Sequence, residues 1–174
     1  EHPDLDVEIV PQTPGFSLSR READIAVMVG RPTERQLHSE SLGTYALGLY
    51  ASESYISDHT MPRTIDELLT HRLIGYVEDL LFSDRINIAK QIASDWQSSI
   101  AIYSPVGQVE AVRSGLGIGV LHQFLLGNGE GLVPVLPELG LSREFFLVSH
   151  PNTERIPRIQ AVLNFMRTLS GSVR

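Results

Sequence analysis

The sequence predicts an α/β fold built mainly from parallel sheets. Short apolar runs typical of buried strands alternate with segments that carry helix start and stop signals. The composition supports this prediction, because 174 residues with 42% apolar and 20% charged side chains can bury a sizeable core and are not disordered. A chain of this length forms one domain or two small lobes.

The N-terminal quarter is expected to hold three strands. Leu5 to Val10 alternates apolar and acidic residues, which predicts a half-buried strand, and a turn cluster follows from Pro11 to Gly15. Ala23 to Val29 is a nearly continuous apolar run that ends at Gly30, a pattern typical of a parallel strand buried on both faces. Leu42 to Tyr50 is the third strand candidate.

The middle of the chain mixes both kinds of element. Thr64 is followed three residues later by Glu67, a capping box that predicts a helix start. Leu73 to Val77 and Ile100 to Tyr103 are short apolar runs that predict strands. The intervening residues 78–97 fit neither a strand nor a helix period and stay unassigned.

The clearest helix signal follows Tyr103. Ser104 is a favourable N-cap, Pro105 suits the first helical position, and Gly115 is placed to close the helix as its C′ residue. The apolar stripe predicted for this helix consists of Val106, Val109 and Val112.

The C-terminal third continues the alternation. Strands are predicted for Ile118 to Leu121 and Glu144 to Val148, with a short helix at Phe124 to Leu126 and an extended segment at Leu132 to Leu136. Pro157 opens a last amphipathic helix, whose predicted apolar face consists of Ile159, Val162, Leu163, Met166 and Leu169.

Charge and composition exclude several classes of protein. With 14 basic and 21 acidic residues the net charge is −7, so phosphate backbones and anionic lipids repel the chain, and nucleic-acid binding by this chain is not expected. Gly115 to Leu126, the most apolar stretch, is too short to span a bilayer, and no targeting segment is visible, so we expect a cytoplasmic protein without membrane contact.

Catalytic and metal-binding patterns are weak. There is no Gly-x-Ser-x-Gly nucleophile elbow, and Ser104 is explained more simply as an N-cap. The chain has no cysteine, and its six histidines include no His-x-x-x-His pair, so neither a metal nor another cofactor is expected. His59 and His71 are interpreted as solvated turn or helix-end residues. We therefore predict that the protein is not an enzyme.

Three features point instead to ligand binding. His122 ends a buried apolar run, and side chains at the carboxyl ends of strands in open α/β sheets face a crevice; the alternative is a core or loop histidine. The helix start at Ser104, with the small Gly107, can bind an anion such as a carboxylate, or is an ordinary capped helix. Arg31, beside Gly30, supplies a counter-cation or is simply solvated.

Several segments, in this order and spacing, resemble the effector-binding domain of LysR-type transcriptional regulators. They are ADIAVMVG (residues 23–30), YASESYISDHTMPRTIDELLTHRLIG (50–75), SPVGQVEAVRSGLGIGVLHQF (104–124), LVPVLP (132–137), and Phe145 to His150 followed by the helix at Pro157. The resemblance covers nearly the whole chain from Leu5 onward.

The resemblance implies a fold like that of type II periplasmic binding proteins, in which two α/β lobes flank a cleft and two strands cross between them. The crossings fall near Leu47 to Tyr50 and near Val148 to His150. Lobe I then contains residues 1–47 and 149–174, with the family's first strand and helix missing, and lobe II contains residues 48–148.

The implied function is control of transcription. In this family a small molecule in the cleft changes the arrangement of a tetramer, and a separate N-terminal winged helix-turn-helix contacts DNA. We therefore expect a small, anionic organic effector, DNA binding only through a domain absent from this chain, and a homodimer or tetramer in the full-length protein. The positions that match effector-contact regions are Gly30, Arg31, Pro32, Tyr76, Tyr103, Ser104, Pro105, Val106, Leu121 and His122.

Three other functions remain open at this point. The first is a periplasmic-type solute-binding protein, which shares the fold class. The second is a two-lobed enzyme, for which only His122 and Arg31 are candidate reactive groups. The third is an interaction domain whose cleft is filled by its own Tyr76, Tyr103 and Phe124.

Overall fold

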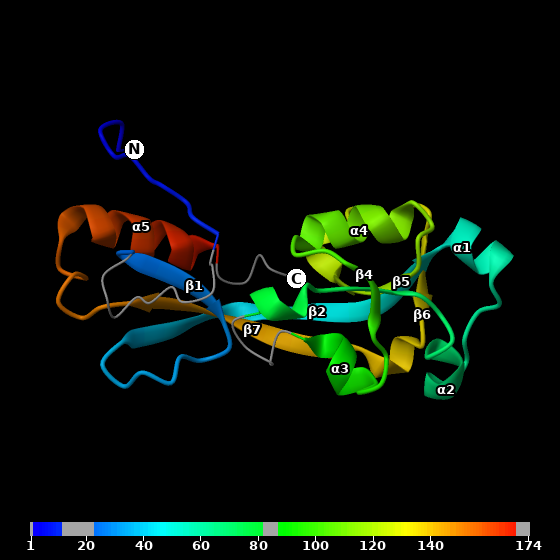
Figure 1. Ribbon diagram of the computed structural model, residues 1–174. Helices are drawn as coiled ribbons and strands as arrows, with labels where there is room; N and C mark the ends of the chain where they lie inside the picture. The colour runs from blue at the N-terminus through cyan, green and yellow to red at the C-terminus, as the bar shows by residue number, and fades with distance from the viewer. Residues whose placement is uncertain (1, 12–22, 82–86, 170–174) are drawn as a thin grey trace. The chain divides into compact units, whose positions relative to one another are not determined.

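The computed structural model describes residues 2–11, 23–81 and 87–169, and the chain divides into two compact units (Figure 1). Unit 1 contains Glu1–Thr44 and Glu144–Val173, and unit 2 contains Tyr45–Arg143. Two strands have residues in both units: β2 (His38–Ser52) and β7 (Leu141–Ser149).

In the described part of the chain, unit 1 contains three strand segments, among them the first part of β2, and a helix that covers them. β1 (Ile25–Val29) pairs with β7 in a register that runs from Ile25 opposite Ser149 to Val29 opposite Phe145. α5 (Pro157–Thr168) packs on one face because its apolar stripe meets alternate strand residues. The buried residues of this core are Leu42, Leu147, Ile159 and Leu163, and a smaller cluster on Phe146 and Val148 packs against Ala23, Ala26, Met28 and Leu37.

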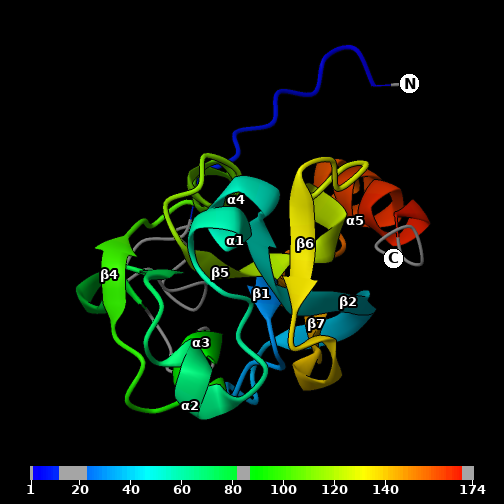
Figure 2. The same cartoon turned by 90° about the vertical axis from the view of Figure 1, so that its right-hand side faces the viewer.

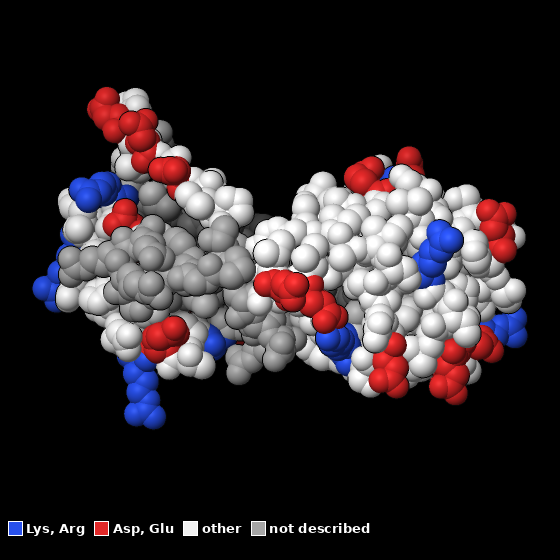
Figure 3. Space-filling view, viewed as in Figure 1, with Lys and Arg blue, Asp and Glu red and all other residues white. Residues whose placement is uncertain are grey.

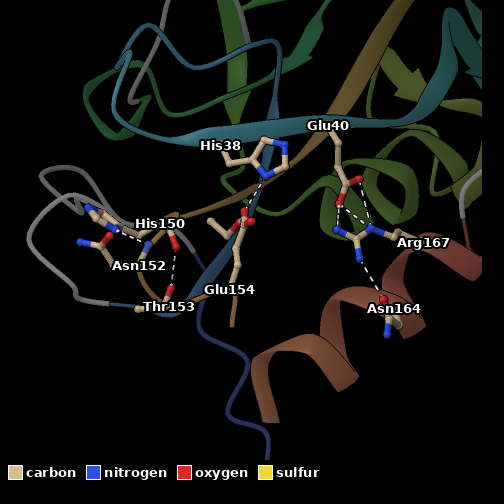
Figure 4. A network of polar contacts seen from close by, with 9 residues as sticks. His38, Glu40, His150, Asn152, Thr153, Glu154, Asn164 and Arg167 are labelled. Atoms are coloured by element: carbon tan, nitrogen blue, oxygen red, sulfur yellow. Dashed lines mark hydrogen bonds and ion pairs between the residues drawn. The ribbon is translucent and has the colours of Figure 1, made fainter. Parts of the chain in front are cut away.

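A polar network holds the segment between β7 and α5 in unit 1 (Figure 4). Glu154 Oε1 accepts hydrogen bonds from Ser149 Oγ at 2.5 Å and from His38 Nδ1 at 2.6 Å, and Arg167 Nε donates to Glu40 Oε1 at 2.8 Å. Desolvation raises the pKa of Glu154, but the two hydrogen bonds and the nearby positive charges outweigh it and leave this pKa below its usual value.

Unit 2 contains a mixed sheet. β3 (Leu73–Gly75) lies between β4 (Ser98–Ala101) and β5 (Ile118–His122) and is parallel to both. β2 is antiparallel to β5 and to β6 (Leu132–Val135), and the whole strand order is β1-β7-β2-β5-β3-β4 with β6 on β2. α4 (Pro105–Arg113) and α3 (Ile88–Ile92) lie on opposite faces of this sheet (Figure 2).

The remaining elements of unit 2 are short. They are the helices α1 (Glu53–Asp58) and α2 (Ile65–Leu68), and the 3-10 helices η2 (Glu78–Leu80), η4 (Gln123–Leu125) and η5 (Pro137–Leu139). None of the helices in the described part of the chain has the length and apolar character needed to cross a membrane.

The predicted helix boundaries are confirmed in atomic detail. Ser104 Oγ accepts a hydrogen bond from the Gly107 amide at 3.3 Å at the start of α4. At its end Gly115 has a φ of 78°, its amide donates to the Val112 carbonyl at 3.0 Å, and the Leu116 amide donates to the Ala111 carbonyl at 3.2 Å. These two bonds define a Schellman motif. The Thr64 capping bond to the Glu67 amide, at 3.2 Å, is likewise present.

Three predictions in the N-terminal region are wrong or lie outside the described residues. Residues 5–10 form no strand and Ile9 is 88% exposed, because no described strand pairs with this segment. β1 is antiparallel, and Val27 is 45% exposed, so it is not a parallel strand buried on both faces. Of the predicted turn at 11–15, residues 12–15 lie outside the described part of the chain.

Smaller corrections concern unit 2. The sheet is mixed rather than mainly parallel, since β3 pairs parallel with β4 and β5 whereas β2 pairs antiparallel with β5 and β6. In α4, Val106 is 57% exposed, and Gln108 takes its place on the buried side together with Val109 and Val112. The unassigned segment 78–97 contains η2 and α3.

Candidate functional site

Several predicted site residues of unit 2 meet at one edge of its sheet. Tyr76 follows β3, Ser104 lies shortly after β4, and His122 is the last residue of β5. Because β3 is parallel to β4 and to β5, the carboxyl ends of the three strands lie at the same edge. Tyr76 Oη is 3.4 Å from His122 Nε2, so these two side chains are in contact.

An aromatic cluster surrounds His122. Tyr45 of β2 stacks on the imidazole, with ring centroids 5.2 Å apart and planes 10° from parallel. Phe124 meets both rings edge-on, at 5.6 Å from Tyr45 and 5.5 Å from His122. We call Tyr45, Tyr76, His122 and Phe124 the His122 cluster. Burial raises the pKa of both Tyr45 and Tyr76 to about 12, so the phenols are neutral donors and acceptors.

Burial favours the neutral form of the His122 imidazole. Burial lowers its pKa, since the charged form loses solvation. Its Nδ1 atom is buried and has no hydrogen-bond partner among the described residues. His122 is therefore neither a solvated loop residue nor a fully satisfied core histidine.

Tyr45 was not among the residues predicted for the site. In the sequence it is only one of several apolar or aromatic positions in a strand. Its stacking on His122 depends on the antiparallel register of β2 and β5, in which Leu47 lies opposite His122. No local pattern indicates that register.

A small pocket lies beside Tyr76. Its volume of about 10 Å³ is enough for about one water molecule, so it cannot hold an organic effector. Gln108, which is 1% exposed, donates from Nε2 to the Ile102 carbonyl at 2.8 Å at this position. The residues that line the pocket are Leu47, Ile74, Gly75, Tyr76, Asn87, Ile88, Ala89, Gln108 and Val120.

The start of α4 offers fewer donors than the sequence suggests. The Gly107 amide donates to Ser104 Oγ, and Pro105 has no N–H. Among the described residues, the Val106 amide is therefore the first-turn donor that has no acceptor. A Cβ at Gly107 would lie 2.9 Å from Ile102 Cγ2. The small residue is therefore needed for packing against Ile102.

Two other predicted positions have different environments. Leu121 is 1% exposed and belongs to the core that contains Ile74 and Val112, because alternation along β5 turns it away from the side of His122. In unit 1, Gly30 has a φ of 76° and ends β1, and Arg31 places its guanidinium 5.3 Å from the ring centroid of Phe146 in a cation–π contact. Pro32 is half-buried next to it.

A second group of rings lies elsewhere in unit 2. Tyr55 stacks on His59 with ring centroids 4.2 Å apart, and Tyr55 Oη is 3.2 Å from His71 Nδ1. Because Tyr55 Oη already accepts a hydrogen bond from the Arg72 amide at 3.3 Å, its own hydrogen is donated to neutral His71. Burial and the charge of His59 lower the pKa of His71, which lies half-buried at the bend after α2 and is bonded to Tyr55.

The pKa of His71 predicts a pH dependence of stability. Because the folded-state pKa is below the ordinary value of about 6.5, the unfolded chain binds more protons as the pH falls through that value. The free energy of unfolding is therefore expected to decrease below about pH 6.5. Urea unfolding at pH 7.5 and 5.5 measures it. His71→Asn keeps an acceptor near the position of Nδ1 and does not titrate, so the decrease in the free energy of unfolding should be smaller in this variant. The decrease that remains is expected to come partly from His122, whose pKa is also lowered. An unchanged decrease in this variant would contradict the assignment.

The family follows from sequence comparison. The profile described as LysR substrate binding domain matches residues 1–170. The chain belongs to the LysR substrate-binding domain family.

Similar proteins are transcriptional regulators rather than enzymes. An uncharacterized HTH-type transcriptional regulator of Haemophilus influenzae is 27% identical over 165 residues, which are 90% of this chain and 56% of that protein. The HTH-type transcriptional regulator CrgA of Neisseria meningitidis serogroup C is 26% identical over 142 residues, covering 79% of this chain and 47% of CrgA. The LysR domain described here thus spans about half the length of the curated relatives it matches.

Solved structures support the same fold. The regulatory domain of CrgA from N. meningitidis has a TM-score of 0.73 at 25% identity, covering 88% of this chain and 78% of that chain. The regulatory domain of AphB from Vibrio vulnificus has a TM-score of 0.71 at 16% identity and covers 96% and 85% of the two chains. The predicted class, an α/β domain of the LysR type with a fold like that of type II periplasmic binding proteins, is confirmed.

Proposed function

We propose that this LysR domain senses a small anionic effector and controls transcription through a DNA-binding domain elsewhere in a cytoplasmic regulator. The observation that supports the proposal is the meeting of Tyr76, Ser104 and His122 at one sheet edge in a domain of this family. An effector that binds one arrangement of the full-length dimer or tetramer more tightly shifts the population toward it. We keep residues 1–47 with 149–174 and residues 48–148 as the proposed lobes.

The proposed effector is a small carboxylate. At the sheet edge of unit 2, the Val106 amide lies at the positive end of the α4 dipole, and the hydroxyl of Tyr76 can also donate a hydrogen bond. We propose that Gly30, Arg31 and Pro32 of unit 1, and Tyr103 and Pro105 of unit 2, also contact this effector. These local donors matter because the chain as a whole carries a charge of −7, which repels anions.

The chain's own charge supports leaving DNA contacts to another domain. Figure 3 shows acidic side chains spread over the face in view, with the Lys and Arg side chains mostly standing apart from one another. A DNA-contacting surface needs clustered cations. Small-molecule binding by this fold has a precedent in the regulatory domain of Synechocystis CcmR, whose structure, at 16% identity and a TM-score of 0.67, is a complex with 2-PG.

The anionic effector is tested by removing two of its proposed contacts. Small mono- and dicarboxylic acids are first screened by thermal shift, and the Kd of each hit is measured by calorimetry. Because a hydrogen bond to a charged group contributes about 1.5–3 kcal/mol, Arg31→Ala combined with Ser104→Ala is expected to weaken binding roughly tenfold or more.

Two matched variants separate binding from folding. Arg35→Ala removes an exposed arginine of the same loop, and Ser104→Thr keeps a capping hydroxyl, so both should bind like the parent chain. Unchanged affinity in the double variant would refute the proposed contacts.

A further inference from the structure

The contact between Tyr76 and His122 can hold its protons in two ways. Either the phenol donates to Nε2 and the imidazole proton is on Nδ1, or Nε2–H donates to the phenol oxygen and Nδ1 keeps its lone pair. The first arrangement uses the hydroxyl hydrogen and leaves Tyr76 only lone pairs, whereas the second leaves Tyr76 its hydrogen to donate to a further group. The tautomer of His122 therefore decides whether Tyr76 can donate a hydrogen bond to a ligand.

Burial of Nδ1 selects between the two arrangements. This atom is buried and has no partner among the described residues. A buried N–H without an acceptor is among the rarest polar defects in proteins, whereas a buried acceptor without a donor is better tolerated. The proton therefore resides on Nε2, which donates to Tyr76 Oη across 3.4 Å, a long hydrogen bond that orients the hydroxyl more than it stabilises it.

The aromatic neighbours keep the imidazole in this orientation. Tyr45 stacks on its face at 5.2 Å, and the edge contact of Phe124 at 5.5 Å limits rotation of the ring. Turning the ring over would exchange the positions of its carbon and nitrogen atoms and bring Nδ1 out of its buried position. The ring stack thus preserves the contact between Nε2 and Tyr76.

We propose that the Tyr76 hydroxyl is the donor that recognises an acceptor oxygen of the effector, a carboxylate or carbonyl oxygen, and that His122 is the positioning residue that donates to the phenol oxygen and so leaves this hydrogen for the effector. The inference rests on the proposed effector-sensing function and names the group that Tyr76 recognises. It also predicts a preference for acceptor groups over ammonium groups, because in this tautomer the hydroxyl hydrogen can pair with an acceptor oxygen, which the opposite tautomer would not allow.

The tautomer is measured directly, without an effector. The two imidazole nitrogens of His122 are assigned by 15N NMR on the 174-residue chain at pH 7.5, with the histidine signals identified from His122→Phe. We expect a protonated Nε2 and an unprotonated Nδ1. A protonated Nδ1 would overturn the proposal. In Tyr76→Phe the Nε2 signal should shift, because this nitrogen loses its acceptor.

Two small probes of similar size then test recognition. Acetate carries only acceptors, and ethylammonium carries only donors. Titration of each is followed by NMR at Tyr76 and at the amides of residues 105–107. Acetate is expected to shift Tyr76 and ethylammonium is not, and Tyr76→Phe should weaken acetate binding about tenfold. His122→Phe keeps an aromatic ring for stacking but has no N–H, and should reduce the preference for acetate over ethylammonium.

The outcomes separate this inference from the proposed function. If acetate shifts the amides of residues 105–107 but not Tyr76, or binds Tyr76→Phe equally well, anion sensing stands and the role of Tyr76 is refuted. If ethylammonium rather than acetate shifts Tyr76, the tautomer assignment is refuted. If neither probe shifts any of these signals, the anion site and the role of Tyr76 fail together.

Discussion

Replacing Leu163 with alanine is expected to lower the free energy of unfolding by about 2–5 kcal/mol, the range found for truncation of a buried leucine. Leu163 lies in α5, is 2% exposed, and packs against Leu42, Leu147 and Ile159. The loss combines the transfer free energy of the removed methyl groups with the cost of the cavity that remains. Because domains of this size are stable by about 5–15 kcal/mol, a large share of the stability would disappear.

The same helix offers a matched control. Phe165 is two residues away and 61% exposed, so Phe165→Ala should change the free energy of unfolding by less than about 0.5 kcal/mol. Both variants are compared with the parent chain by urea denaturation at pH 7.5. An equal decrease in the free energy of unfolding at the two positions would show that the face of α5 that carries Leu163 is not buried in the core of unit 1.

Helix ends could be predicted from the sequence because their determinants are local. Ser104, Pro105 and Gly115 lie within one turn of the boundaries they set, and their side-chain oxygen, ring and positive φ act on neighbouring backbone groups. The burial of side chains along the same helix was less predictable. Val106 is apolar but exposed, since the sheet meets the helix on the side of Gln108 and Val112.

Strand direction could not be predicted in the same way. The run before Gly30 reads as a parallel core strand, yet β1 pairs antiparallel with β7, more than a hundred residues away in the sequence. Hydrophobicity shows that a strand will be buried but not which strand will pair with it. Leu5 to Val10 shows the opposite case, in which an alternating pattern is present without a described pairing partner.

Only part of the candidate site could be predicted, because strand pairing decides which side chains meet. Tyr76, Ser104 and His122 follow successive parallel strands, so a rule about the carboxyl ends of strands brings them together. Tyr45 reaches His122 across an antiparallel pair, and no rule based on chain order indicates that contact. The sequence suggests that Gly107 is small so that an anion can approach. The structure supplies a different reason, because it places Ile102 beside this residue.

Gly117→Ala is expected to lower the free energy of unfolding by about 3 kcal/mol, although it adds a single methyl group. A Cβ at this position would lie 2.5 Å from the Arg72 carbonyl oxygen. No side-chain rotation relieves the clash, because the obstructing atom belongs to the backbone. The same oxygen accepts the Ile118 amide at 2.9 Å, so moving it also weakens the bond that joins the start of β5 to the residue before β3.

Gly129→Ala separates this clash from the general cost of replacing a glycine. Gly129 has a φ of 69° and open space around its Cβ position, so alanine there should cost only about 1 kcal/mol of backbone strain. The two free energies of unfolding are measured by urea denaturation. Because β3 and β5 carry Tyr76 and His122 at their ends, Gly117→Ala should also shift the NMR signals of both residues in the folded chain, whereas Gly129→Ala should not. A Gly117 variant as stable as the Gly129 variant would show that β3 and β5 can move apart without cost, and the register that places Tyr76 beside His122 would lose its physical basis.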